Sequence, residues 1–192
     1  MTTIRFHLAA LLAGALAGSS QLHAQATRPA PAQSLVDAAV HTAAAEHKAV
    51  LVTFGASWCG WCHRFHAFLV DTGVGPIMAA HYVTVSLVTE ELPANAALEN
   101  PGSEAMMKAM GGAASGLPFF FVLDSTGRKI ADSNIMPNGT NVGHPYEPEE
   151  VAAFDQLLVR TAPRMASAER ARIRAYLDRI AGRSASTQPR TK

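Results

Sequence analysis

The spacing of hydrophobic and polar residues changes several times along this chain, and each change predicts an element. Residues 49–54 form a short, nearly continuous apolar run, which is typical of a strand buried on both faces of a sheet. Residues 82–88 alternate and are rich in β-branched side chains, so they predict a second strand. The run 119–123, the turn residues 124–127 and the segment 128–132 predict a β-hairpin.

Apolar residues at helical spacing predict helices around these strands. Ser34 is a suitable N-cap for the first helix, which should extend to about His47. The side chains expected to face the core from this helix are Leu35, Ala38, Ala39 and Thr42. Further helices are predicted at residues 59–71, 74–80, 104–110, 148–161 and 167–181. Residues 134–148 lack periodicity, and a loop of this length could lie near an active site.

The only two cysteines of the chain lie in the stretch Trp58-Cys59-Gly60-Trp61-Cys62-His63, between a predicted strand and a predicted helix. A cysteine at the first turn of a helix meets unpaired N–H groups and the positive end of the helix dipole, which stabilise its thiolate. We therefore expect Cys59 to be the exposed, more acidic nucleophile and Cys62, one turn inside, to be the resolving thiol. Trp61 should lie exposed between them as a substrate contact, and Trp58 should pack beside the motif and shield it.

Three other interpretations use the same residues. The pattern from Cys59 to His63 also fits covalent attachment of a c-type haem, with His63 as an axial ligand. Helical spacing brings Cys62, His63 and His66 toward one side, so a metal site is the second alternative. A permanent structural disulfide is the third and simplest reading, although a loop this short removes little chain entropy.

The strand, the Trp-Cys-X-X-Cys motif, the helix and the later Gly116-Leu117-Pro118 resemble the thioredoxin superfamily over residues 35–130. The resemblance implies an α/β, thioredoxin-like fold with a central mixed sheet flanked by helices. It also implies a cis bond before Pro118 that holds the Leu117 backbone against the cysteines, where it can pair with substrate. Two positions depart from thioredoxin itself, since Thr53 replaces a buried acid and Trp61 replaces a proline.

The termini predict the remaining organisation. A positively charged start, an apolar run from residue 8 to 18 and small residues near Ala26 indicate a signal peptide over residues 1–26. We expect a flexible lead-in (27–33), a thioredoxin-like domain (34–162), a C-terminal amphipathic helix (163–182) as an extension, and a disordered tail (183–192). The mature protein should be periplasmic or secreted and have no transmembrane segment.

Charge is distributed unevenly along the chain. Residues 28–159 hold six Lys/Arg and thirteen Asp/Glu, a net charge of about −7, whereas residues 160–192 hold nine and two, about +7. We expect this basic end to dock on the acidic body or on anionic lipid rather than on nucleic acid.

Taken together, these features predict an exported thiol:disulfide oxidoreductase that needs no bound cofactor or metal. Its partners should be exported proteins with cysteines or disulfides and a membrane redox protein. Cys59 and Cys62 should carry the exchange, supported by Trp58, Gly60, Trp61, His63 and Pro118, with Trp61, Leu117 and Pro118 contacting substrate. Use as a reductant or isomerase is favoured, and a haem or metal carrier remains the alternative.

Overall fold

A computed structural model of the protein describes residues 28–183. The predicted signal peptide (1–26) and residues 184–192 of the predicted tail lie outside the described residues. The helices, in chain order, are α1 (Ala32–Glu46), α2 (Gly60–Val70), α3 (Gly75–His81), α4 (Ser103–Met107), α5 (Pro148–Thr161) and α6 (Ser167–Ile180). Three short turns complete them, the 3₁₀-helices η1 (Pro93–Leu98) and η3 (Pro137–Gly139) and the π-helical η2 (Lys108–Gly112).

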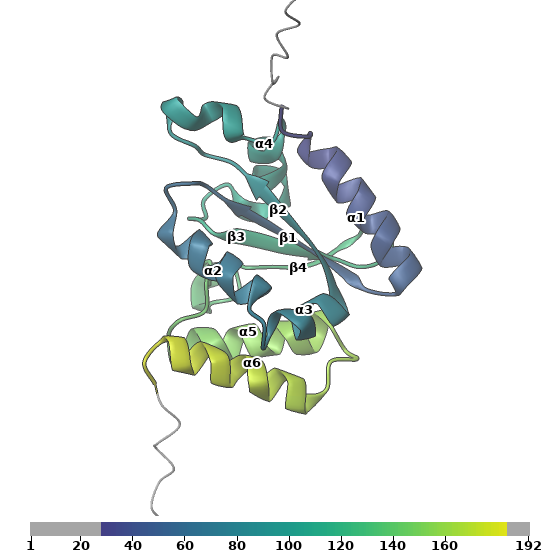
Figure 1. Cartoon of the computed structure of the whole chain (residues 1–192), viewed down its shortest axis with the longest axis vertical. Coiled ribbons are helices and arrows are strands. Elements are labelled where there is room, and N and C mark those ends of the chain that lie inside the picture. The colour runs from purple at the N-terminus through teal and green to yellow at the C-terminus, as the bar shows by residue number, and fades with distance from the viewer. Residues whose placement is uncertain (1–27, 184–192) are drawn as a thin grey trace, which may run out of the picture.

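A four-stranded mixed sheet lies at the centre of the molecule (Figure 1). Its strands are β1 (Ala49–Gly55), β2 (Tyr82–Val88), β3 (Phe119–Leu123) and β4 (Lys129–Asp132). They are ordered β2-β1-β3-β4, with β1 parallel to β2 and antiparallel to β3, and with β3 antiparallel to β4. The mixed sheet and all four predicted strands are confirmed.

Helices cover both faces of this sheet, α1 and α4 on one side and α2, α3, α5 and α6 on the other (Figure 1). Because successive side chains of a strand point to opposite faces, β1 contributes Val50 and Val52 to the core under α1 and Leu51 to the core under α2. This is why residues 49–54 read as a continuous apolar run. The predicted α/β architecture is confirmed.

The first helix differs from its prediction. It begins at Ala32, so Ser34 is not the N-cap and two residues of the expected lead-in are helical. The buried residues of α1 are Ala32, Val36, Ala39 and Ala43. Ala38 and Thr42, predicted to face the core, are exposed. Alanine is common on both faces of this helix, so hydrophobicity alone could not fix which face is buried.

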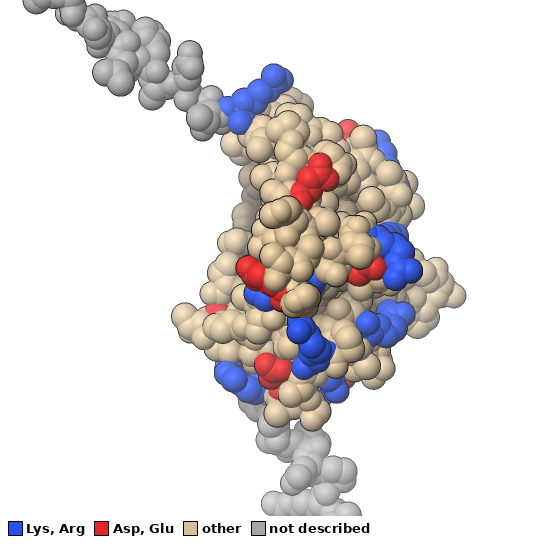
Figure 2. Space-filling view, turned by 90° about the vertical axis from the view of Figure 1, so that its right-hand side faces the viewer, with Lys and Arg blue, Asp and Glu red and all other residues tan. Residues whose placement is uncertain are grey.

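The last helix packs on the body as predicted. Ile173, Tyr176 and Leu177 are buried, and the Tyr176 ring lies 5.7 Å from that of Phe68 on α2. The positively charged face of α6 also meets the body, because α6 arginines contact Asp155 of α5. Lys and Arg gather among Asp and Glu in the lower half of the face in Figure 2, at the level of α5 and α6. Docking of this basic helix on the body is therefore confirmed.

Candidate active site

The two cysteines lie where β1 ends and α2 begins. Cys59 is the N-cap of α2, and its Sγ accepts a hydrogen bond from the backbone N–H of Cys62 at 3.1 Å. Cys59 and Cys62 form a disulfide with their Cα atoms 5.2 Å apart. The predicted place of Cys59 at the start of the helix is confirmed. A sulfur anion at this position would meet free N–H groups and the positive end of the dipole.

The exposure of the two cysteines is opposite to the expectation. Cys59 is only 4% exposed, whereas Cys62 is partly exposed. Position along a helix does not fix exposure, because segments outside the helix also pack against its first turn. The prediction that Cys59 is the more exposed residue is therefore wrong for the disulfide form.

Trp61 is confirmed as an exposed side chain between the cysteines, with 46% of its surface accessible. Trp58 is 52% exposed, and its indole N–H donates to the Glu90 carbonyl at 2.8 Å. A half-exposed ring held in this way shields the motif less than expected. His63 is also exposed, and its Nε2 lies 2.8 Å from the Ser57 carbonyl oxygen. Gly60 is the first residue of α2.

The segment before β3 meets the motif as the resemblance implied. The Leu117-Pro118 peptide bond is cis. Pro118 is buried, and it lines both the cavity that Trp61 lines and the cavity that Cys62 lines. The Asn141 amide donates to the carbonyl oxygens of Gly116 and Pro118, at 2.6 and 3.0 Å. Among the described residues, neither the N–H nor the C=O of Leu117 has a hydrogen-bond partner, so both can receive another chain.

A cavity of about 330 Å³ opens beside Cys62. Thr53, which replaces the buried acid of thioredoxin, lines it and hydrogen-bonds through its hydroxyl to Ser86 Oγ at 3.2 Å. Glu91 is the one carboxylate among the lining residues of this cavity. Its two oxygens accept the backbone N–H and the hydroxyl of Ser57, at 2.6 and 2.7 Å. These bonds fix the carboxylate of Glu91, which lines the same cavity as Cys62.

A larger groove of about 890 Å³ is bounded by Trp61, by the Leu117-Pro118 segment and by the loop between β4 and α5. The ring of His144 stacks with Trp61 at 6.1 Å, and Tyr146 meets Trp61 edge-on at 5.4 Å. The long loop predicted from residues 134–148 therefore lies at the active site.

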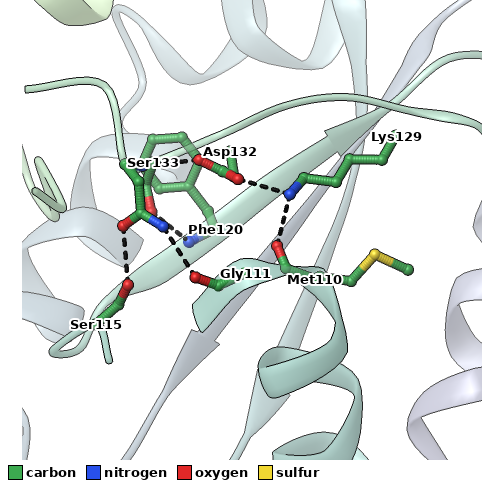
Figure 3. A network of polar contacts seen from close by, with 8 residues as sticks. Met110, Gly111, Ser115, Phe120, Lys129, Asp132 and Ser133 are labelled. Atoms are coloured by element: carbon green, nitrogen blue, oxygen red, sulfur yellow. Dashed lines mark hydrogen bonds and ion pairs between the residues drawn. The ribbon is translucent and has the colours of Figure 1, made fainter. Parts of the chain in front are cut away.

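A polar network fixes one wall of this groove (Figure 3). Lys129 Nζ donates to Asp132 at 2.6 Å and to the Met110 carbonyl at 2.7 Å, which ties β4 to η2. Asn134 donates to the Gly111 carbonyl at 2.9 Å and accepts the Ser115 hydroxyl at 2.8 Å. The segment that leads into Leu117 and the start of the loop are thereby held together.

Sequence reasoning missed the side chains that the loop brings to the motif, namely Asn141, His144 and Tyr146. An available signal was the pair of aromatic rings in an otherwise Gly-, Asn- and Pro-rich loop, because exposed loops rarely retain large rings without a packing partner.

A family model described as "Thioredox_DsbH: Protein of unknown function, DUF255" matches residues 14–180. The chain belongs to this family. The family name and the observed fold agree with the resemblance to thioredoxins, which is confirmed. No curated protein matches the chain.

The chain is also similar, at low identity, to several solved structures. A disulphide isomerase from Xylella fastidiosa Temecula1 is 20% identical, with a TM-score of 0.46, covering 86% of this chain and 98% of that one. The oxidised C-terminal domain of DsbD from Neisseria meningitidis is 27% identical, with a TM-score of 0.36 and coverage of 54% and 84%. A protein titled "DsbH Oxidoreductase" is 19% identical, with a TM-score of 0.41 and coverage of 76% and 94%.

The family name, the fold and the paired cysteines make this protein a thioredoxin-like protein with a Cys-X-X-Cys disulfide. The two sulfur atoms are bonded to each other in this structure. Residues 28–183 contain no group of three or more His, Cys, Asp or Glu arranged to hold a metal ion. No helix in that part of the chain has the length and hydrophobicity to cross a membrane.

Proposed function

We propose that this protein is a thiol–disulfide oxidoreductase that exchanges electrons with cysteines of other exported proteins through Cys59 and Cys62. In the reducing direction, the Cys59 thiolate attacks a substrate disulfide, forms a mixed disulfide and releases one substrate thiolate, which takes up a proton. Cys62 then attacks Cys59 Sγ, loses its proton and releases the second substrate thiol. Two electrons pass to the substrate, and the Cys59–Cys62 disulfide forms. A membrane-bound dithiol protein would return it to the reduced state.

The observation that carries this proposal is the disulfide at the N-terminus of α2. The hydrogen bond from Cys62 N–H to Cys59 Sγ, together with the helix dipole, supports Cys59 as the nucleophile and stable leaving group. The opposite assignment would leave the attacking sulfur one turn inside the helix, where backbone N–H groups already bond within the helix.

Substrate recognition is proposed for Leu117, Pro118 and Trp61. The free N–H and C=O of Leu117 can pair with an extended chain in the manner of an added β-strand. The exposed Trp61 ring offers apolar contact beside the reacting sulfurs. Gly60 and His63 complete the motif, and Trp58 anchors the turn before it on the Glu90 carbonyl.

Glu91 is proposed as the group that receives the Cys62 proton. Thr53 cannot do so, because a hydroxyl is a weak base and this one is already hydrogen-bonded. Glu91 shares a cavity with Cys62, and a water molecule there can pass the proton between them. Glu90, also an acid of this segment, does not line that cavity.

Export and direction complete the proposal. The signal-peptide pattern of residues 1–26 supports a periplasmic or secreted protein. The proposed exchange between thiols and disulfides needs no bound cofactor. The uncharged Gly60-Trp61 pair between the cysteines supports use as a reductant or isomerase, because charge that stabilises the thiolate makes a disulfide more oxidising. Equilibration with reduced and oxidised glutathione measures the potential, and a value as oxidising as that of a dedicated oxidase would contradict this direction.

Trapping tests the function itself. A Cys62→Ser variant should accumulate mixed disulfides with exported proteins in the producing cell, since the resolving thiol is missing. Cys59→Ser is the matched control and should trap few partners. Abundant trapping by Cys59→Ser and none by Cys62→Ser would reverse the two roles. A visible spectrum with a strong Soret band in the purified protein would instead support the haem carrier.

A further inference from the structure

His144 has an unusual environment in the loop beside the motif. It is 4% exposed, yet neither ring nitrogen has a hydrogen-bond partner among residues 28–183. Buried polar atoms are almost always paired, because an unpaired one has lost its hydrogen bonds to water. Two unpaired nitrogens on one buried ring therefore need an explanation beyond packing.

The ring is held from two sides by aromatic side chains. It stacks with Trp61 at an interplanar angle of 29° and meets the Phe65 ring edge-on, with 6.1 Å between centroids in both pairs. Since Trp61 lies between the cysteines and Phe65 lies in the core, these contacts fix His144 directly beside the motif. A ring that is fixed in this way cannot rotate freely to find another partner.

The groove of about 890 Å³ lies against the imidazole, because His144 is one of its lining residues. Trp61, Leu117 and Pro118 line the same groove, so it is continuous with the place where a substrate would meet the cysteines. Its volume exceeds what a few ordered waters need and suits several residues of an extended chain.

The imidazole is a hydrogen-bonding group here rather than an acid or base. Burial, with a smaller effect of the Arg64 charge, lowers the pKa of His144 to about 4. At neutral pH the ring is uncharged and offers one N–H donor and one acceptor. A peptide group presents the complementary acceptor and donor.

We propose that His144 is a positioning residue that hydrogen-bonds the main chain of a substrate protein beside the cysteine under exchange, in the groove between Trp61 and the 134–147 loop. This inference rests on the proposed function. It makes the enzyme selective for cysteines within extended polypeptide over small disulfides, because small disulfides have no peptide main chain to offer the imidazole. The ring then finds its partners only in the complex.

The test compares two substrates in the reduced full-length protein. One is a peptide that carries a cysteine as a mixed disulfide with a chromophoric thiol, and the other is bis(2-hydroxyethyl) disulfide. His144→Phe keeps an aromatic ring for Trp61 and Phe65 but removes both nitrogens. It should raise KM for the peptide about three- to tenfold, the loss expected for one or two hydrogen bonds, and change the rate with the small disulfide less than about twofold.

Controls separate positioning from folding. His144→Gln keeps a donor and an acceptor and should recover part of the peptide KM, whereas His41→Phe on the exposed face of α1 should behave as wild type. If His144→Phe does not fold, His144→Leu gives the same comparison with a smaller side chain. Equal losses with both substrates, or a shifted reduction potential, would overturn the role of His144. A wild-type protein that reduces neither substrate would instead contradict the proposed function.

Discussion

The backbone of Gly55, the last residue of β1, lies directly against the side chain of Cys62. A Cβ atom added at Gly55 would stand 3.0 Å from Cys62 Cβ and 3.2 Å from its Sγ. Both distances are shorter than comfortable van der Waals contact. The absence of a side chain at position 55 thus allows the helix that carries the cysteines to approach the end of the strand.

Substitution of Gly55 by alanine should displace Cys62. We expect a loss of about 1–3 kcal/mol in the free energy of unfolding, because overpacking forces neighbouring groups apart. Urea titration of the oxidised protein measures it. Gly60→Ala is the matched control, since no atom lies within 4 Å of its added Cβ, and it should be neutral or stabilising. Equal stability of Gly55→Ala and wild type would show that the contact relaxes without cost.

Glu91 gives a kinetic prediction. Glu91→Gln keeps an oxygen for Ser57 but removes the basic carboxylate, so resolution of a mixed disulfide on Cys59 should slow about tenfold. This is below the usual effect of a base in direct contact, because water would carry the proton. Stopped-flow release of a chromophoric thiol measures the step.

Glu90→Gln is the matched control, because Glu90 is a neighbouring acid that does not line the cavity beside Cys62. It should resolve the mixed disulfide at the wild-type rate. Equal slowing in both variants would indicate a general effect of negative charge and remove Glu91 from the mechanism.

The elements of this fold were predictable where local pattern and burial agree. Residues 49–54 and 119–123 lie at the centre of the sheet, so their continuous hydrophobicity reflects burial on both faces. The motif itself marked the start of α2, because cysteines spaced for exchange need a helix N-terminus.

The remainder of the site depends on contacts between distant segments. The stacking of His144 on Trp61 joins residues far apart in the chain, and no spacing rule encodes it. The burial of Cys59 is likewise decided by segments outside its helix. The buried face of α1 was predicted wrongly because alanine at Ala38 looks as hydrophobic as alanine at Ala39, and only the packing distinguishes them.

Asp155 joins the two C-terminal helices. Its Oδ1 lies 2.7 Å from Arg174 Nη1 and 3.4 Å from Arg170 Nε, and its side chain is 15% exposed. Asp155→Asn should cost about 1–2 kcal/mol of unfolding free energy, between the values for exposed pairs and buried charge-assisted bonds. Chemical denaturation measures this.

The control for Asp155 is an exposed ion pair between Glu104 of α4 and Lys108 of η2. Glu104→Gln should cost less than about 0.5 kcal/mol, because both side chains are more than half exposed and solvent screens the pair. If the two substitutions cost the same, Asp155 does not clamp α6 to α5.

The unfolding free energy should depend on the pH through His144. Its pKa is about 4 in the folded protein, because burial disfavours the imidazolium, and about 6.5 when unfolded. Between these values the unfolded chain binds more protons, so the protein is fully stabilised above pH 6.5 and loses stability as the pH falls through 4, by about 3 kcal/mol at most.

Glu169, whose pKa is also lowered, titrates in both wild type and His144→Phe, so the difference between their stability curves isolates the histidine. Urea titrations from pH 7 to 4 should give a flatter curve for His144→Phe. Parallel curves would mean that the ring takes up its proton as readily in the folded protein as in the unfolded chain.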